Sequence, residues 1–225
     1  SFSWRVMTLP PAVIDYIICE WRAHGRKLAE TADQLARAND LVSRYVAAQV
    51  TEQIMAGNYE AVNRHDRREL TIFFSDIKGF GALADRLEPE DISEFMNDYL
   101  SEMTGIAQAH GATIDKFIGD AVMTFFGAPR TTGDREQALQ AVRMSIAMQR
   151  RVGELSRKWV KEGRLDEAFH IRIGINTGVA SVGNFGSRER MDYTAIGRQV
   201  NLAARLQVAC EPGGVLISHA TWVLV

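Results

Sequence analysis

The pattern of apolar and polar residues after position 69 predicts a domain built of strands and helices. Leu70–Ser75 is rich in apolar and β-branched residues, which predicts a buried strand. Pro89 then begins a segment with the 3.6-residue period of a helix, and Gly111 ends it. The apolar positions of this helix are Ile92, Phe95, Met96, Tyr99, Leu100, Met103 and Ile106.

A hairpin and a long helix are predicted next. Thr113–Ile118 and Ala121–Phe126 are separated only by Gly119 and Asp120. A two-residue connection with glycine first predicts a hairpin with a type II′ turn. Asp134 is expected to cap the helix that follows. The apolar stripe of that helix comprises Leu139, Val142, Ile146, Val152 and Leu155.

The remaining elements complete an α+β pattern. Phe169–Asn176 and Val179–Phe185 predict a second strand pair. Gln199–Val208 predicts a helix, and Val215–Ser218 predicts a last strand. The order strand, helix, hairpin, helix, hairpin, helix, strand is typical of one mainly antiparallel sheet with helices on a face.

Residues 1–66 form a different region, with helical character and few turn residues. Leu28, Leu35 and Val42 recur every seven residues, with Ala38 and Tyr45 between them. This recurrence is too short to decide between a coiled coil and a helix packed on its own domain. A polar cluster at residues 64–68 marks a boundary. We therefore expect an N-terminal helical segment at 1–66 and a second domain at 67–225.

Composition and charge exclude several classes of protein. The 225 residues are 46% hydrophobic and 24% charged, an ordinary globular balance, and the net charge is −2. A nucleic-acid binder usually carries a basic surplus, so no nucleic-acid partner is expected. The cysteines Cys19 and Cys210 match no metal-binding spacing, which indicates idle thiols in a reducing compartment. No apolar run reaches the roughly 18 residues of a membrane-spanning helix.

Two aspartates are candidate metal ligands because of their positions. Asp76 directly follows the strand Leu70–Ser75, and Asp120 lies at the tip of the predicted hairpin. If the two carboxylates converged, they would make an oxygen-rich site for Mg²⁺ or Mn²⁺. A turn-forming aspartate at each place is the alternative, and their spacing does not decide between these interpretations.

Other residues suit the binding of a phosphate. The loop after Asp76 contains Gly79 and Gly81 and can present backbone N–H groups. Asn201 and Arg205 are four residues apart on one predicted helix, so they share a face, where a guanidinium can meet a phosphoryl group. A solvated asparagine and a surface-paired arginine are the alternative.

Three segments, taken together, closely resemble the class III nucleotidyl cyclase catalytic domain. They are Phe73–Phe80, Asp115–Met123 and Met191–Arg205, connected through Gly174–Gly178 and Val182–Gly186. The resemblance covers roughly residues 68–225 and keeps the family's order. It implies a ferredoxin-like, palm-type βαββαβ cyclase domain.

The resemblance also implies a role for each matching residue. Asp76 and Asp120 match the pair that binds two Mg²⁺ or Mn²⁺ ions, and the backbone carbonyl of Ile77 matches a further ligand. Gly79 and Phe80 fall in the loop that holds the triphosphate. Asn201 matches the residue that orients the ribose. Arg205 matches the residue that stabilises the transition state.

The resemblance implies ATP as the substrate. Lys116 matches the lysine that reads the purine, and Thr194 stands where many adenylate cyclases have Asp. This threonine resembles subclass IIIb, which often responds to bicarbonate. Lys116 can only donate hydrogen bonds and Thr194 can accept them, which suits adenine. The implied enzyme is an adenylate cyclase, a phosphorus–oxygen lyase that forms 3′,5′-cyclic AMP and pyrophosphate.

In this family the site lies between two protomers, so the resemblance implies a homodimer. Asp76 and Asp120 come from one protomer, whereas Lys116, Thr194, Asn201 and Arg205 come from the other. The N-terminal segment would then couple an input to the catalytic domain. A guanylate cyclase and a catalytically silent cyclase-like module are the alternatives.

Two departures from the family pattern stand out. Gly81 occupies a place where family members commonly have Thr. The chain also stops at Val225, before the late strands that carry a second, triphosphate-binding lysine. Because it begins with Ser, we expect it to be a piece of a longer protein. We expect a cytoplasmic catalytic domain, and a longer parent protein leaves room for an upstream sensory or membrane domain.

Overall fold

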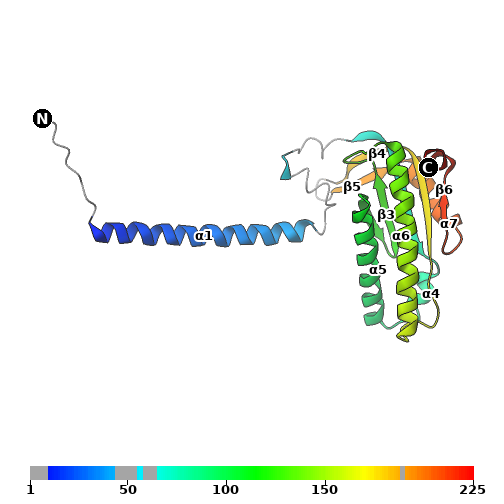
Figure 1. Ribbon diagram of the computed structural model, residues 1–225, viewed down its shortest axis with the longest axis horizontal. Coiled ribbons are helices and arrows are strands. Elements are labelled where there is room, and N and C mark those ends of the chain that lie inside the picture. The colour runs from blue at the N-terminus through cyan, green and yellow to red at the C-terminus, as the bar shows by residue number, and fades with distance from the viewer. Residues whose placement is uncertain (1–9, 44–54, 58–64, 188–190) are drawn as a thin grey trace. The chain divides into compact units, whose positions relative to one another are not determined.

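The computed structural model describes residues 10–43, 55–57, 65–187 and 191–225 (Figure 1). The chain divides into two units, Ser1–Val46 and Ala47–Val225. In the first unit the helix α1 (Pro11–Ser43) confirms the predicted helical segment. Leu28 and Leu35 are 75% and 71% exposed on it. The side chain of Val42 and all of Tyr45 fall outside the described residues, so both interpretations of the heptad recurrence stay open.

The second unit is built on one sheet, and its described strands run in the order β2-β3-β1-β4-β5, with β6 beside β4. The pairings along this order are antiparallel, and β6 is parallel to β4. The strands are β1 (Asp66–Ile77), β2 (Thr113–Ile118), β3 (Ala121–Phe126), β4 (Ile171–Gly186), β5 (Met191–Ile196) and β6 (Val215–Ile217). The predicted mainly antiparallel sheet is therefore confirmed.

Helices cover both faces of this sheet. They are α4 (Phe80–Ala84), α5 (Pro89–Ala109), α6 (Asp134–Lys161), α7 (Arg198–Ala209) and α8 (His219–Leu224). The long helices α5 and α6 lie side by side on one face, as Figure 1 shows. The succession β1, α5, β2, β3, α6, β4 is the predicted βαββαβ arrangement. None of the described helices combines the length and the apolar character needed to cross a bilayer.

Alternation along β1 creates two hydrophobic cores because successive side chains point to opposite faces. Phe73 is fully buried with residues of α5 and α6. Ile72 and Phe74 lie in a second core with Ala203 of α7. On the partly exposed side of the same two helices, Arg151 of α6 donates two hydrogen bonds to Glu102 of α5, at 2.9 and 2.7 Å. This bidentate pair fixes the two helices relative to each other.

The structure corrects the predicted second strand pair. β4 continues from Ile171 to Gly186 without a turn, and Thr177 and Gly178 pair with Thr71 and Leu70 of β1. The partner of β4 in a hairpin is β5, which the sequence pattern did not predict. Glycine at 178 serves packing instead of a turn, because a β-carbon there would lie 2.8 Å from the Gln199 side chain of α7.

The start and the buried face of α6 also differ from expectation. Gly133 is the N-cap and offers no side chain for a capping hydrogen bond, and Asp134 is the first helical residue. Asp134 still favours the helix through its charge at the positive end of the dipole. Ile146 is 45% exposed, whereas the predicted Val152 and Leu155 are buried. The buried face comprises Ala138, Ala141, Met144, Met148, Val152, Leu155 and Trp159.

Replacing Gly174 tests how closely α7 packs on the sheet. A β-carbon at this position would overlap the amide nitrogen of Gln207 and the carbonyl oxygen of Ala203, and both are backbone atoms that cannot move aside. Gly174→Ala is expected to cost about 3 kcal/mol, or roughly 10 °C in Tm. Gly105→Ala is the matched control, because the β-carbon meets nothing within 4 Å and alanine favours the helix α5. Melting of Gly174→Ala at the wild-type temperature would contradict this packing.

Candidate active site

The two candidate metal-binding aspartates converge at one end of β1. Asp76 is the second-last residue of that strand, and Asp120 lies in the turn between β2 and β3. Because Ser75 pairs with Val122, this turn lies beside the end of β1. The backbone N–H of Ile77 donates to Oδ2 of Asp120 at 2.8 Å. The structure thus brings the two carboxylates to the same end of the sheet, and their role as metal ligands stays a prediction.

Burial makes this end of the sheet favourable for a cation. Oδ2 of Asp76 accepts a hydrogen bond from Nη2 of Arg172 at 2.9 Å. Oδ1 of Asp76 is buried and has no hydrogen-bond partner among the described atoms. Burial raises the pKa of Asp120, the N–H of Ile77 acts in the opposite direction, and the nearby charge of Asp76 raises it further. An additional positive charge would give the unpaired oxygen of Asp76 a partner and would offset the repulsion between the carboxylates of Asp76 and Asp120.

The residues present fit Mg²⁺ or Mn²⁺. Mg²⁺ is usually held by one or two carboxylates together with phosphate oxygens of the substrate and water. Asp76 and Asp120 would supply the two carboxylates, and the predicted third ligand is the carbonyl of Ile77. No cluster of three or more His, Cys, Asp or Glu side chains occurs in the described parts of the chain. The remaining ligands of an ion would therefore come from the backbone, the substrate and water.

Arg172 is a site residue that the sequence pattern did not indicate. It lies on β4 directly across from Asp76, and its side chain is only 15% exposed. Its Nη1 also donates to the carbonyl of Val208 at 3.2 Å, which ties the site to the end of α7. Only the pairing register of β1 and β4 brings Arg172 to Asp76.

A second polar cluster brings together the two residues predicted to read the base. Oγ1 of Thr194 donates to Oδ2 of Asp115 at 2.6 Å, and the backbone N–H of Ala195 donates to the same oxygen at 3.2 Å. Nζ of Lys116 lies 3.2 Å from the other oxygen, Oδ1. The side chain of Asp115 is fully buried, whereas Lys116 is 38% exposed. We did not predict a role for Asp115.

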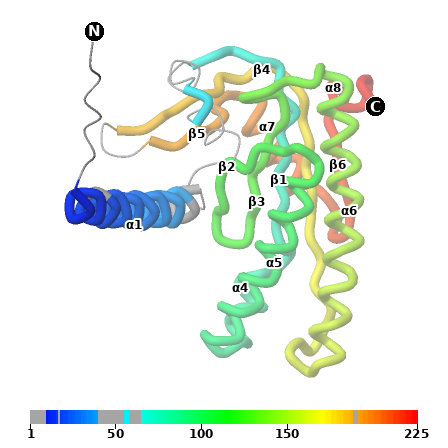
Figure 2. The backbone as a smooth tube through the Cα atoms, turned by 60° about the vertical axis from the view of Figure 1, so that its left-hand side comes forward, coloured from blue at the N-terminus to red at the C-terminus, as the bar shows by residue number. Residues whose placement is uncertain are grey.

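This second cluster also shows that the sheet is strongly curved. β2 and β5 stand at opposite ends of the strand order, yet Asp115 of β2 bonds to two residues of β5. The two edges can meet only if the sheet bends round, and Figure 2 shows the β2–β3 and β4–β5 hairpins that do so. The curvature brings together residues 79 positions apart in sequence.

The loop predicted to hold the triphosphate follows β1. Gly79 adopts φ of 73°, a conformation that glycine tolerates and other residues rarely adopt. Phe80 begins the short helix α4, and its ring stacks on Phe95 at a centroid distance of 6.5 Å. The side chain of Phe80 therefore packs against the core. The phosphate contact of this loop stays a prediction that concerns its backbone.

Asn201 and Arg205 share the exposed face of α7, as their spacing predicted. Ala203 between them is fully buried against the sheet. Within the described residues, no hydrogen bond or ion pair joins Asn201 or Arg205 to Asp76 or Asp120. The one link between the aspartate site and α7 in the described contacts is therefore Arg172, which reaches both Asp76 and the carbonyl of Val208.

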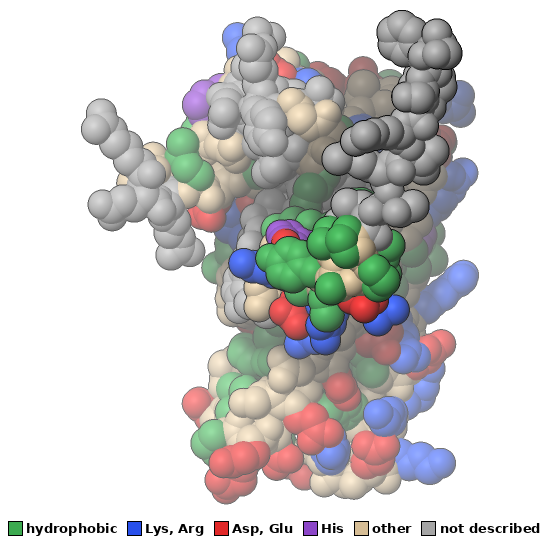
Figure 3. All heavy atoms as spheres, turned by 90° about the vertical axis from the view of Figure 1, so that its left-hand side faces the viewer, with side chains coloured by type: hydrophobic (Ala, Val, Ile, Leu, Met, Phe, Trp, Pro, Cys, Tyr) green, Lys and Arg blue, Asp and Glu red, His purple; other side chains and the backbone are tan. Residues whose placement is uncertain are grey.

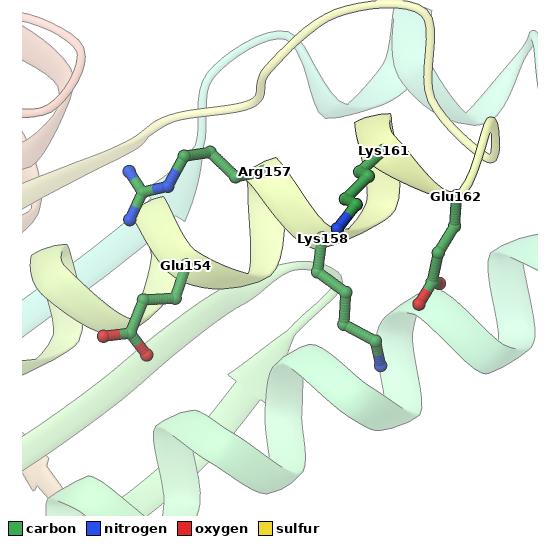
Figure 4. Close-up of a pocket in the computed structure, with 5 residues that line it drawn as sticks. All are labelled: Glu154, Arg157, Lys158, Lys161 and Glu162. Atoms are coloured by element: carbon green, nitrogen blue, oxygen red, sulfur yellow. The ribbon is translucent and has the colours of Figure 1, made fainter.

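The surface also contains a hollow that involves none of the predicted site residues. It is lined by Glu154, Arg157, Lys158, Lys161 and Glu162, whose side chains all extend from the last turns of α6 or its C-cap (Figure 4). Charges of both signs occur there, and both signs also occur on the face in Figure 3. Because a single helical segment forms it, this hollow lacks the converging groups of a catalytic site.

Known proteins resemble this chain over most of its length. The family "Adenylate and Guanylate cyclase catalytic domain" matches residues 62–225. Adenylate cyclase 1 of Rhizobium meliloti (strain 1021) is 30% identical over 82% of the chain, and the adenylate cyclase of Anabaena cylindrica is 34% identical over 80%. The chain spans 28% and 34% of the lengths of these relatives.

Solved structures agree with the sequence relatives. The adenylyl cyclase CyaB from P. aeruginosa is 51% identical, with a TM-score of 0.70 over 72% of this chain and 82% of that chain. The guanylyl cyclase Cya2 is 36% identical, with a TM-score of 0.67 over 71% of this chain and 79% of that chain. Both an adenylyl cyclase and a guanylyl cyclase are therefore among the structural neighbours. Since the family match spans residues 62–225, the chain belongs to the adenylate and guanylate cyclase catalytic domain family.

Proposed function

We propose that this chain is the catalytic domain of an adenylate cyclase, which converts ATP to 3′,5′-cyclic AMP and pyrophosphate. The observation that carries the proposal is the convergence of Asp76 and Asp120 at the end of β1, with one buried carboxylate oxygen unpaired. In this reaction the ribose 3′-oxygen attacks the α-phosphorus and pyrophosphate leaves. Such a transfer depends mainly on positioning and on the neutralisation of charge.

Asp76 and Asp120 would hold two Mg²⁺ or Mn²⁺ ions together with the carbonyl of Ile77. Bound ions of this kind supply Lewis acidity, which lowers the pKa of the 3′-hydroxyl and neutralises charge on the triphosphate. The protein's own contribution is to fix the two carboxylates. Asp120 is held by the N–H of Ile77, and Asp76 is held by Arg172.

The second set of residues binds the other parts of the nucleotide. Lys116 and Thr194 both contact the carboxylate of Asp115, and both can read the edge of the purine. Asn201 orients the ribose, and Arg205 meets the charge that builds on the α-phosphoryl oxygens. Both side chains lie on the exposed face of α7 and are accessible to a nucleotide.

We propose that each site is completed by a second copy of the chain. The aspartate pair of one protomer would meet Lys116, Thr194, Asn201 and Arg205 of the other protomer. Exposed apolar side chains near the hairpin tip support a contact of this kind, since Phe117 is 44% exposed and Ile118 is 55% exposed. A two-fold dimer would then contain two equivalent sites.

ATP is preferred because of hydrogen-bond polarity. Adenine offers an acceptor at N1 and donors at N6, whereas guanine offers a donor at N1 and an acceptor at O6. Lys116 is donor-only, so it suits N1 of adenine and opposes N1–H of guanine. A hydroxyl can accept from the adenine N6 amino group.

The test is cyclic-nucleotide formation from ATP and from GTP, in parallel, with Mn²⁺ and then with Mg²⁺. We expect cyclic AMP from ATP and little product from GTP, with activity lost when EDTA removes the metal. Predominant formation of cyclic GMP would replace the proposal with guanylate cyclase activity. No product from either nucleotide, with a dimer verified by sedimentation, would favour a catalytically silent module.

A further inference from the structure

We propose that Asp115 is the positioning residue that makes this site selective for adenine, because it fixes the Thr194 hydroxyl as a hydrogen-bond acceptor and holds Lys116 beside it. The inference rests on the proposed function, since it concerns how that same site reads its nucleotide. Asp115 itself need not touch the base. It acts through the two side chains that do.

The first step concerns the single hydrogen of the Thr194 hydroxyl. A hydroxyl group can donate one hydrogen bond and accept others, so by itself Thr194 could face either purine. Its Oγ1 lies 2.6 Å from Oδ2 of Asp115 and 3.4 Å from the carbonyl of Ala195. The shorter contact is to a carboxylate, which is the stronger acceptor. The hydrogen is therefore committed to Asp115, and the free lone pairs of Oγ1 can only accept.

The second step concerns the anchoring of Asp115. Its side chain is fully buried between β2 and β5, and the N–H of Ala195 donates to the same oxygen that Thr194 uses. Burial raises the pKa of Asp115, while the hydrogen bond from Thr194 and the charge of Lys116 lower it. The backbone donor fixes the position of Oδ2. The direction of the Thr194 hydroxyl is thereby set by the approach of β2 to β5 and not by solvent.

The third step concerns Lys116. Its Nζ lies 3.2 Å from Oδ1 of Asp115, so one carboxylate contacts both base-reading side chains through different oxygens. An ammonium group has three donors and a flexible stem, and the partly exposed Lys116 would otherwise take many positions. The ion pair holds it next to Thr194. The result is a donor and an acceptor side by side, as the N1 and N6 edge of adenine requires.

Rejection of guanine follows from the same arrangement. The O6 atom of guanine would face lone pairs of Thr194, and its N1–H would face the ammonium of Lys116. Neither contact can form a hydrogen bond while Asp115 keeps the threonine hydrogen. Without Asp115, the hydroxyl can rotate and donate to O6, so discrimination falls.

The experiment compares Asp115→Ala, Asp115→Asn and Thr113→Val with the wild-type chain. For each protein kcat and KM are measured with ATP and with GTP, and equilibrium binding of both nucleotides is measured by calorimetry. For Asp115→Ala we expect the ATP-to-GTP ratio of kcat/KM, and of affinity, to fall by about 10- to 100-fold, the effect of losing a charge-assisted contact. Most of the change should appear in KM.

Asp115→Asn separates the two roles of the carboxylate. Two donors converge where Oδ2 lies, so the amide oxygen will occupy that place and keep Thr194 as an acceptor. The amide NH₂ then faces Lys116 and cannot hold the ammonium. We expect Asp115→Asn to retain more of the ATP preference than Asp115→Ala but to bind ATP more weakly than the wild type.

Thr113→Val is the matched control for structural damage. Thr113 is a buried residue of the same strand, and its Oγ1 donates to the carbonyl of Ala128 at 2.6 Å, away from the base-reading cluster. It should lower Tm and leave the ATP-to-GTP ratio unchanged. An unchanged ratio in Asp115→Ala, or the same change in Thr113→Val, would overturn the inference.

The binding measurement separates this inference from the proposed function. A wild-type chain that forms no cyclic nucleotide but binds ATP over GTP in an Asp115-dependent manner would refute the activity and support the inference. A wild-type chain that binds the two nucleotides equally would overturn the inference, even if it formed cyclic AMP.

Discussion

Asp76→Asn is expected to reduce cyclase turnover by about three orders of magnitude or more, because the amide cannot hold a cation beside Asp120. The substitution keeps the shape of the side chain, and its amide oxygen can still accept the hydrogen bond from Arg172. The fold and the proposed dimer are therefore expected to survive. Turnover is measured as cyclic AMP formed with saturating Mn²⁺, and dimerisation is measured by sedimentation.

A control on the same strand separates this loss from a general effect of removing a charge. Asp66 lies at the other end of β1, where it also pairs with an arginine, Arg68, at 2.9 Å. Asp66→Asn should keep wild-type turnover. If Asp76→Asn kept more than a tenth of the wild-type rate, the assignment of Asp76 as a metal ligand would be wrong.

Mixing Asp76→Asn with Arg205→Ala is expected to restore activity that neither variant has alone. If the site is shared, the mixed dimer contains one site that combines the intact carboxylates of one chain with the intact arginine of the other. Random exchange makes about half of the dimers mixed, each with one good site of two, so the expected recovery is about a quarter of the wild-type rate. The measurement is cyclic AMP formation after the two proteins have been co-incubated and allowed to exchange.

The corresponding control mixes Asp76→Asn with Asp120→Asn. Both substitutions affect the same half of the site, so every site in a mixed dimer lacks one carboxylate and no recovery is expected. Recovery in this control, or none in the first mixture despite proven exchange, would contradict a site shared between protomers.

Elements with strong local signals were predicted almost to the residue. β2 and β3 begin and end where the pattern places them, and Gly119 between them has the positive φ of 64° that a type II′ turn requires first. Pro89 is the first residue of α5, as predicted. In each case the deciding interaction lies within a few residues in sequence.

Features that depend on distant parts of the chain could not be predicted in this way. Gly178 suggested a turn, but its partner is a helix about 20 residues later, and β4 runs straight through it. The approach of Asp120 to Asp76 depends on the register of β1 with β3. Arg172 and Asp115 were missed for the same reason, since cross-strand pairing and sheet curvature give them their partners.

The glycines of β4 have a consequence for how freely the sequence can vary. At Gly174 the backbone of α7 lies directly against the strand, since a β-carbon there would overlap backbone atoms of Ala203 and Gln207. The height of the helix above the sheet is then independent of the residues on its outer surface. Substitutions around Asn201 and Arg205 can accumulate over evolutionary time without displacing either one, so the outer face of α7 can change while the scaffold beneath it stays the same.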